Sequence, residues 1–318
     1  MYKKFYKLRL NPFEIAPDPS FLYLTRRHQE ALLALYHGVQ RRKGFLALTG
    51  DVGTGKTLLI RCLFRMLKDS GIAYAHVFNS RLSTLEFLHY IATEFGLATS
   101  GESKGEVLQD LRKCVVVRHQ RKLTTMIVVD DAQDLSIGVL EEIRLISNLE
   151  TEAEKLLQIL LVGQQELDEK LDSFELRQLK QRIALRPHLE PFSLEETRGY
   201  IRHRLQRAGG SAEAQDLFPE EAIERVYRHS CGVARLINSI CENALISAFA
   251  RQSRRVPPEV IDEVAFDLRL NVTSRPPAEH SKSNEEANGE GIKSGDEEVT
   301  TIAQGRRMLE QTLGSNEN

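Results

Sequence analysis

The stretch Gly50-Asp51-Val52-Gly53-Thr54-Gly55-Lys56-Thr57 decides the fold, because it fits the pattern G-x-x-x-x-G-K-[ST] of a phosphate-binding loop. Its glycines allow a tight turn that directs backbone N–H groups inward. Those N–H groups, together with the start of the next helix, form a concave site for phosphate oxygens. Lys56 is expected to contact the β- and γ-phosphates, and the Thr57 hydroxyl to help coordinate Mg²⁺.

The flanks of this loop supply the context that the pattern requires. Residues 44–49 form a short apolar run that predicts a buried strand. Residues 58–67 predict a helix with a broad apolar face. We expect Leu58, at the start of this helix, to contact the nucleotide. The strand–loop–helix arrangement therefore predicts a nucleoside triphosphate site with Mg²⁺.

A second acidic signal follows another apolar run. Met126-Ile127-Val128-Val129 predicts a buried strand, and it ends in Asp130-Asp131. This is the shape of the Walker B element, whose aspartate holds Mg²⁺ opposite the Thr or Ser of the loop. An acid at the carboxyl end of a parallel strand also lies at the edge where open α/β sheets bind ligands. We therefore expect Asp130 to be a metal ligand with Thr57.

Strands and helices alternate through the first part of the chain. Further strands are predicted at 72–79, 156–162 and 183–189, the last interrupted by Pro187 and so placed at an edge or ending early. Helices are predicted at 84–95, 105–122, 135–149 and 174–182, with Asp134 as the N-cap of the third. The alternation predicts an α/β fold, with a five-stranded parallel sheet between two helical layers.

The pattern changes at Phe192. Helices without strands are predicted from Ser193 to Ala208, and at 219–229, 233–251 and 257–270. From Thr273 onward the chain is rich in Ser, Glu, Asn, Gly and Lys, which is typical of disorder. We therefore divide the chain into a nucleotide-binding domain (1–191), a small helical lid (192–270) and an acidic, disordered tail (271–318).

Net charge, cysteine spacing and the length of apolar runs indicate which partners and which compartment suit this chain. The formal net charge is −2, and the tail contributes nine acidic and five basic residues, so the rest is nearly neutral. This balance does not favour DNA binding, although the basic residues of 105–122 would suit a phosphate backbone. The four cysteines include no C-x-x-C pair and are expected to be buried and reduced. No apolar run is long enough to span a membrane, which predicts a cytoplasmic protein.

The order of motifs resembles that of the AAA+ ATPases, and within them the general secretion pathway protein A group. Relatives of this group include ATPases of pilus biogenesis and of transposition. The resemblance covers residues 1–270 and rests on several further segments: Asn11-Pro12-Phe13, Phe21-Leu22-Tyr23-Leu24, residues 140–145 and 147–150, Leu161-Val162-Gly163-Gln164, residues 176–179, Gln181-Arg182, and Gly232 with residues 235–238.

The resemblance implies roles that spacing alone does not show. Gln164 falls at the sensor-1 position and would touch the γ-phosphate or the attacking water. Arg235 falls at the sensor-2 position of the lid. Arg182, with Arg177 as the second choice, falls where the family places an arginine finger, which a neighbouring subunit receives. The resemblance thus implies a homo-oligomer and a protein partner of secretion or pilus type, which could hold the chain at the inner membrane.

One departure from the family pattern concerns catalysis. The family follows the Mg²⁺ aspartate with a glutamate that polarises the attacking water, whereas this chain has Asp131. The carboxylate is one methylene shorter and stops about 1.5 Å short. We expect Asp131, Lys56, Gln164 and Arg182 to support slow hydrolysis. Gln133 and Asp134 are close enough in sequence to be considered as substitutes for the missing glutamate. Two alternatives to an ATP-driven assembly or remodelling factor stay open: a nucleotide-gated interaction switch, and a DNA-transposition regulator.

Overall fold

The computed structural model describes residues 2–15, 18–68, 70–78, 81–98, 103–151, 154–209 and 216–270. The described residues form two compact units. One unit consists of residues 26–190, and the other joins residues 2–25 to residues 191–270. The predicted tail, 271–318, lies outside the described residues.

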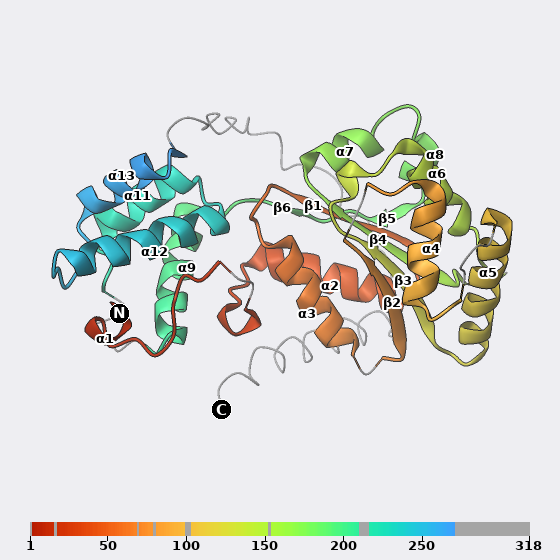
Figure 1. Ribbon diagram of the computed structural model, residues 1–318, viewed down its shortest axis with the longest axis horizontal. Helices are drawn as coiled ribbons and strands as arrows, with labels where there is room; N and C mark the ends of the chain where they lie inside the picture. The colour runs from red at the N-terminus through yellow and green to blue at the C-terminus, as the bar shows by residue number, and fades with distance from the viewer. Residues whose placement is uncertain are drawn as a thin grey trace, which may run out of the picture. The chain divides into compact units, whose positions relative to one another are not determined.

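Residues 26–190 are built around a parallel sheet (Figure 1). In the described part of the chain its strands run in the order β2-β3-β4-β1-β5, with the short β6 also paired to β1. The strands are β1 (Phe45–Gly50), β2 (Ile72–Val77), β3 (Thr124–Val129), β4 (Leu157–Gly163), β5 (Ile183–Leu185) and β6 (His188–Leu189). The expected five-stranded parallel sheet is thus confirmed, and β1 with its phosphate-binding loop lies inside it rather than at an edge.

Helices cover both faces of this sheet (Figure 1). One face carries α2 (Arg26–Gln40) and α3 (Lys56–Leu67), and the other α4 (Thr84–Glu94), α5 (Lys104–Gln120) and α6 (Ile137–Ile146). Alternate residues of β1 serve the two layers: Phe45 and Ala47 join the core beneath α4, α5 and α6, whereas Leu46 packs against Gly38 of α2. The period of two in a strand thus produces two apolar cores from one buried run.

The structure differs from the expected elements in three places. The last predicted strand divides into β5 and β6 around Pro187, which has no N–H for the ladder. The predicted helix 174–182 shortens to α8 (Arg177–Lys180), and an unpredicted helix, α7 (Gln165–Leu171), follows β4 directly. Ser136, not Asp134, is the N-cap of α6, because its hydroxyl accepts from the N–H of Val139.

The second unit is helical. Its main helices are α9 (Leu194–Arg207), α11 (Glu220–Ser230), α12 (Ala234–Ala250) and α13 (Pro258–Asp267). A capping box between Ser193 and Glu196 starts α9 at the place where the sequence predicts a helix to begin. Gly232, with φ 76°, follows α11, and a Cβ there would come within 1.9 Å of the Phe192 carbonyl oxygen, so only glycine fits.

The N-terminal segment packs on these helices, although the sequence placed it with the sheet. It contains α1 (Tyr2–Phe5) and a 3₁₀ turn, η1 (Pro19–Phe21). The buried Arg204 guanidinium donates to the carbonyl oxygens of Pro12 and Glu14, and the Tyr2 hydroxyl donates to Glu242 at 2.8 Å. These bonds join residues far apart in the chain, which sequence spacing does not reveal.

Within the ranges that the structure describes, no helix combines the length and the hydropathy needed to cross a bilayer.

Candidate nucleotide site

The phosphate-binding loop connects β1 to α3 as predicted. Gly50 ends β1 where a Cβ would approach the Leu189 carbonyl oxygen to 2.4 Å, so a side chain would clash with backbone. Gly55 is the left-handed N-cap of α3, with φ 99°, and no side chain caps the helix. The first N–H groups of α3 therefore remain available at a positive helix end, which suits phosphate oxygens.

Lys56 lies inside this loop, with only 8% of its surface exposed. Its ammonium donates to the carbonyl oxygens of Gly50 at 2.7 Å and Asp51 at 2.9 Å. Desolvation lowers the pKa of Lys56, and the nearby carboxylates of Asp130 and Asp131 act in the opposite direction. An ammonium has three donors, so one remains for an anion that enters the loop.

Thr57 and Asp130, the two residues expected to bind metal, lie together. The Thr57 hydroxyl is 3.4 Å from Oδ2 of Asp130, at the end of β3. Burial raises the pKa of Asp130, while a hydrogen bond from the Asp131 N–H at 3.0 Å opposes that rise. A hydroxyl and a carboxylate are hard oxygen ligands of the kind that Mg²⁺ prefers, so the residues present fit this ion. The described residues contain no cluster of three or more His, Cys, Asp or Glu side chains placed to bind a metal.

Asp131 and Gln164 lie at the same edge of the sheet, where β3 and β4 end. Asp131 is exposed and adopts a left-handed backbone with φ 51°, at the start of the 3₁₀ turn η2 (Ala132–Asp134). Gln164 follows β4 and is the N-cap of α7. Gln133 lies between them, because its side chain bonds both residues. Asp131 and Gln164, the predicted water-orienting acid and the predicted sensor, are thus connected through Gln133.

The two candidate arginine fingers have different surroundings. Arg182 donates to Ser147 Oγ at 3.0 Å, to the Arg144 carbonyl and to Asn148 Oδ1, so it binds the C-terminal end of α6. Arg177 is exposed and lies 4.1 Å from the ring of Phe174, which is itself 78% exposed. Arg177 is therefore the more accessible of the two to another subunit, and the role of either stays a prediction.

Arg235, the predicted lid residue, is exposed in the first turn of α12, in the helical unit. Its approach to the phosphates stays a prediction.

His28 is a site residue that sequence reasoning missed. It comes from α2, is 5% exposed, and its Nε2 lies 3.1 Å from the Thr54 carbonyl oxygen in the loop. The same nitrogen would be 3.8 Å from a Cβ on Gly55. No local pattern marks this histidine, because the contact depends on how α2 packs beside the loop.

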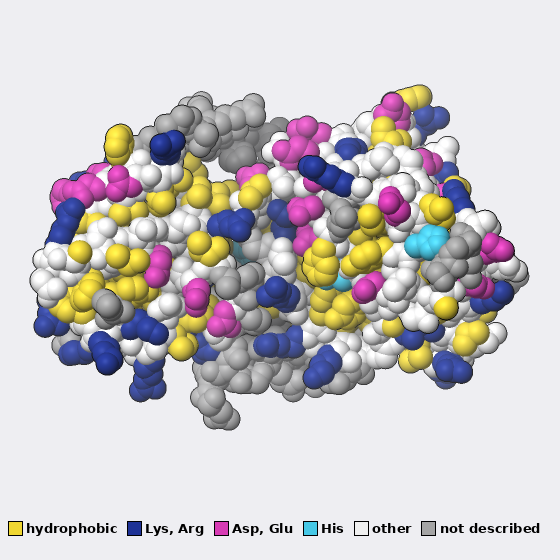
Figure 2. Space-filling model, viewed as in Figure 1, with side chains coloured by type: hydrophobic (Ala, Val, Ile, Leu, Met, Phe, Trp, Pro, Cys, Tyr) yellow, Lys and Arg dark blue, Asp and Glu magenta, His cyan; other side chains and the backbone are white. Residues whose placement is uncertain are grey.

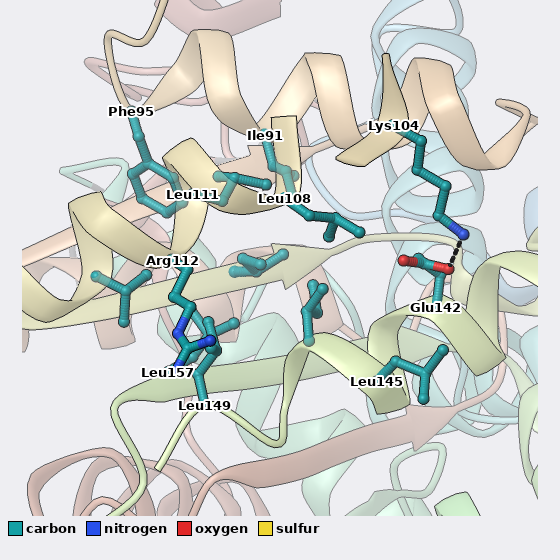
Figure 3. Close-up of a pocket in the computed structure, with 13 residues that line it drawn as sticks. Ile91, Phe95, Lys104, Leu108, Leu111, Arg112, Glu142, Leu145, Leu149 and Leu157 are labelled. Carbon is teal, nitrogen blue, oxygen red and sulfur yellow. Dashed lines mark hydrogen bonds and ion pairs between the residues drawn. The ribbon is translucent and has the colours of Figure 1, made fainter. Parts of the chain in front are cut away.

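A cavity of about 310 Å³ lies elsewhere in the sheet unit, between α4, α5 and α6 (Figure 3). Its lining is mainly apolar, with the Lys104–Glu142 ion pair at one end and Arg112 toward the other. No predicted nucleotide-site residue is among the described residues that line it. The candidate nucleotide site therefore rests on the loop and its neighbours rather than on this cavity.

Comparison with known proteins agrees with this architecture. Residues 39–171 match a family model described as an AAA domain. The general secretion pathway protein A of Aeromonas hydrophila is 42% identical over 270 residues, which are 84% of this chain and 48% of that protein. The chain therefore spans about half the length of this curated relative.

Solved structures show the same fold at low sequence identity. The ORC2 protein of Aeropyrum pernix aligns with a TM-score of 0.60 at 18% identity, covering 83% of this chain and 74% of that one. Cdc6p of Pyrobaculum aerophilum gives 0.58 at 21% identity, covering 77% and 68%. The RuvB motor of Thermotoga maritima gives 0.51 at 14% identity, covering 77% and 70%. Residues 39–171 are therefore an AAA domain, and over 270 residues the chain is a homologue of general secretion pathway protein A.

Proposed function

We propose that this chain binds MgATP at the loop of residues 50–57 and hydrolyses it to drive assembly or remodelling in secretion- or pilus-type machinery. The observation that carries the proposal is the arrangement of Lys56, Thr57 and Asp130. A buried ammonium, a hydroxyl and a carboxylate lie beside an uncapped helix N-terminus, which is the environment a triphosphate with a divalent cation requires.

Different residues of the chain bind the phosphates, hold the metal ion and orient the attacking water. Lys56 and the loop N–H groups hold the phosphates, and Thr57 and Asp130 would hold Mg²⁺, which neutralises phosphate charge when bound. Asp131 orients the attacking water, and Gln164 contacts the γ-phosphate or that water. Catalysis here consists of positioning and charge stabilisation.

An arginine delivered from a neighbouring subunit completes the site. Arg177 suits that role through its exposure, and Arg182 through the family position it occupies. An arginine supplied in this way is worth about 10³–10⁵ in rate, so the proposal includes a homo-oligomer whose activity rises with protein concentration. Arg235 of the helical unit would sense the bound phosphates.

A nucleotide-gated switch is the second candidate, and the identity of Asp131 favours it. A carboxylate that stops about 1.5 Å short of the usual position slows hydrolysis while leaving the binding loop intact. ATP would then set a conformation that a partner recognises. Phosphate release measured with the site saturated by MgATP separates the two candidates, because only the first requires sustained turnover.

The distribution of charged side chains gives little support to the third candidate, a regulator of DNA transposition. Arg118, in the basic helix α5, binds Thr125 Oγ1 at 3.1 Å and the Thr124 carbonyl rather than facing solvent alone. In the sheet unit, Figure 2 shows basic and acidic side chains mixed over the visible face. DNA retention that falls steeply with salt would nevertheless support this alternative.

The test of nucleotide binding is Lys56→Ala, with Lys68→Ala, an exposed residue just after the same helix, as the matched control. Loss of a charge-assisted contact with phosphate predicts a fall in MgATP affinity of about 100-fold, measured with a fluorescent ATP analogue. The control should bind like the wild type. A wild-type protein without measurable MgATP affinity, or a Lys56→Ala variant that binds normally, would contradict the proposal.

A further inference from the structure

Gln133 makes two hydrogen bonds that lie on opposite sides of its amide. Its Nε2 donates to Oδ1 of Asp131 at 3.2 Å, and its Oε1 accepts from the backbone N–H of Gln164 at 3.1 Å. One bond reaches the loop after β3, and the other reaches the loop after β4. A glutamine has one donor end and one acceptor end, so it can satisfy both partners, which neither glutamate nor methionine can.

The surroundings keep this side chain in place. A Cβ on Gly163 would lie 2.9 Å from Gln133 Oε1 and 2.8 Å from the Cβ of Leu167, so glycine leaves room for the amide. Lys170 of α7 donates to the backbone carbonyl of Gln133 and, at 2.9 Å, to that of Leu135. Main chain and side chain of Gln133 are thus both tied to the segment that begins at Gln164.

Asp131 needs such a restraint because it is exposed and stands on a left-handed turn. An exposed carboxylate otherwise samples several rotamers, and only some of them direct an oxygen toward the attacking water. Among the described residues, Gln133 donates a side-chain hydrogen bond to the Asp131 carboxylate, and this bond limits its rotamer freedom.

We propose that Gln133 is a positioning residue that couples the water-orienting Asp131 to the phosphate-sensing Gln164. When Gln164 moves to contact the γ-phosphate, its N–H carries the Gln133 amide with it, and the amide turns the Asp131 carboxylate. The acid is therefore aligned when the phosphate to be attacked is present. This inference rests on the proposed function, since it assigns Gln133 a role in hydrolysis.

The experiment compares Gln133→Met and Gln133→Glu with Gln120→Met, an exposed glutamine at the end of α5. Methionine loses both bonds, whereas glutamate keeps the acceptor for Gln164 and loses the donor to Asp131. Because misplacement of about 1 Å costs on the order of 10²-fold, both variants should lower kcat about 10- to 100-fold. The MgATP affinity of both Gln133 variants should remain within about threefold of wild type, because the lost bonds do not contact the bound nucleotide. Gln120→Met should match wild type in both kcat and MgATP affinity.

A double-mutant cycle with Asp131→Ala distinguishes positioning from a general structural effect. If Gln133 acts through Asp131, Gln133→Met should cause no further loss of kcat once Asp131 is alanine. The inference is overturned if Gln133→Met retains wild-type kcat, or if its loss is just as large in the Asp131→Ala protein. A wild-type protein that binds MgATP but releases no phosphate overturns the hydrolytic function, and the inference with it.

Discussion

Lengthening Asp131, the acid next to the proposed metal ligand Asp130, tests the geometric account of catalysis. Asp131→Glu extends the side chain by one carbon–carbon bond, about 1.5 Å. Asp131 is exposed, so the longer side chain does not have to fit into a buried, close-packed space. If a shortfall of about 1 Å costs on the order of 10²-fold, kcat should rise about 10- to 100-fold.

The same substitution should cost a little stability. Asp131 has φ 51° and ψ 40°, a left-handed conformation that the short polar side chain of aspartate tolerates better than glutamate does. We expect the free energy of unfolding to fall by up to about 1 kcal/mol. A faster but slightly less stable enzyme is therefore the signature of this variant.

The assay is phosphate release at saturating MgATP, with thermal unfolding measured on the same preparations. Asp267→Glu is the matched control, because it adds one methylene to an exposed acid at the end of α13, in the helical unit. The control should leave kcat unchanged. The geometric reasoning is refuted if Asp131→Glu binds MgATP normally and turns over no faster than wild type.

Two further predictions concern stability. Arg204→Met removes a buried guanidinium and leaves carbonyl acceptors unpaired, so urea unfolding followed by circular dichroism should show a loss of about 2–5 kcal/mol, whereas the exposed Arg202→Met should change little. Burial raises the pKa of Asp168, but hydrogen bonds from His188, Thr49 and Arg186 outweigh it, and the net direction is downward. The stabilisation is then present above the unfolded value of 3.8 and lost as pH falls through the lower folded pKa. Asp168→Asn should therefore lower the free energy of unfolding at pH 7 by about 1–3 kcal/mol. The gap to wild type should narrow only as pH falls below the unfolded value of 3.8, and a constant gap across pH would contradict the charge-based explanation.

Local patterns were sufficient for the sheet and for the binding loop. The loop is eight consecutive residues, and its glycines and lysine act on the backbone they belong to, so the sequence predicts it without knowledge of distant contacts. Short apolar runs likewise mark β1, β3 and β4, because a central parallel strand is buried on both faces. The contact of Thr57 with Asp130 followed from the rule that parallel strands end at one edge.

Other contacts between side chains distant in the sequence were decided by the tertiary structure alone. Residues 2–25 join the helical unit, where Arg204 finds its acceptors at Pro12 and Glu14 across 192 and 190 positions, a pairing that no spacing encodes. His28 reaches the loop, and Gln133 bridges to Gln164, for the same reason: periodicity specifies which face of an element is buried, whereas packing selects the atoms that touch across it.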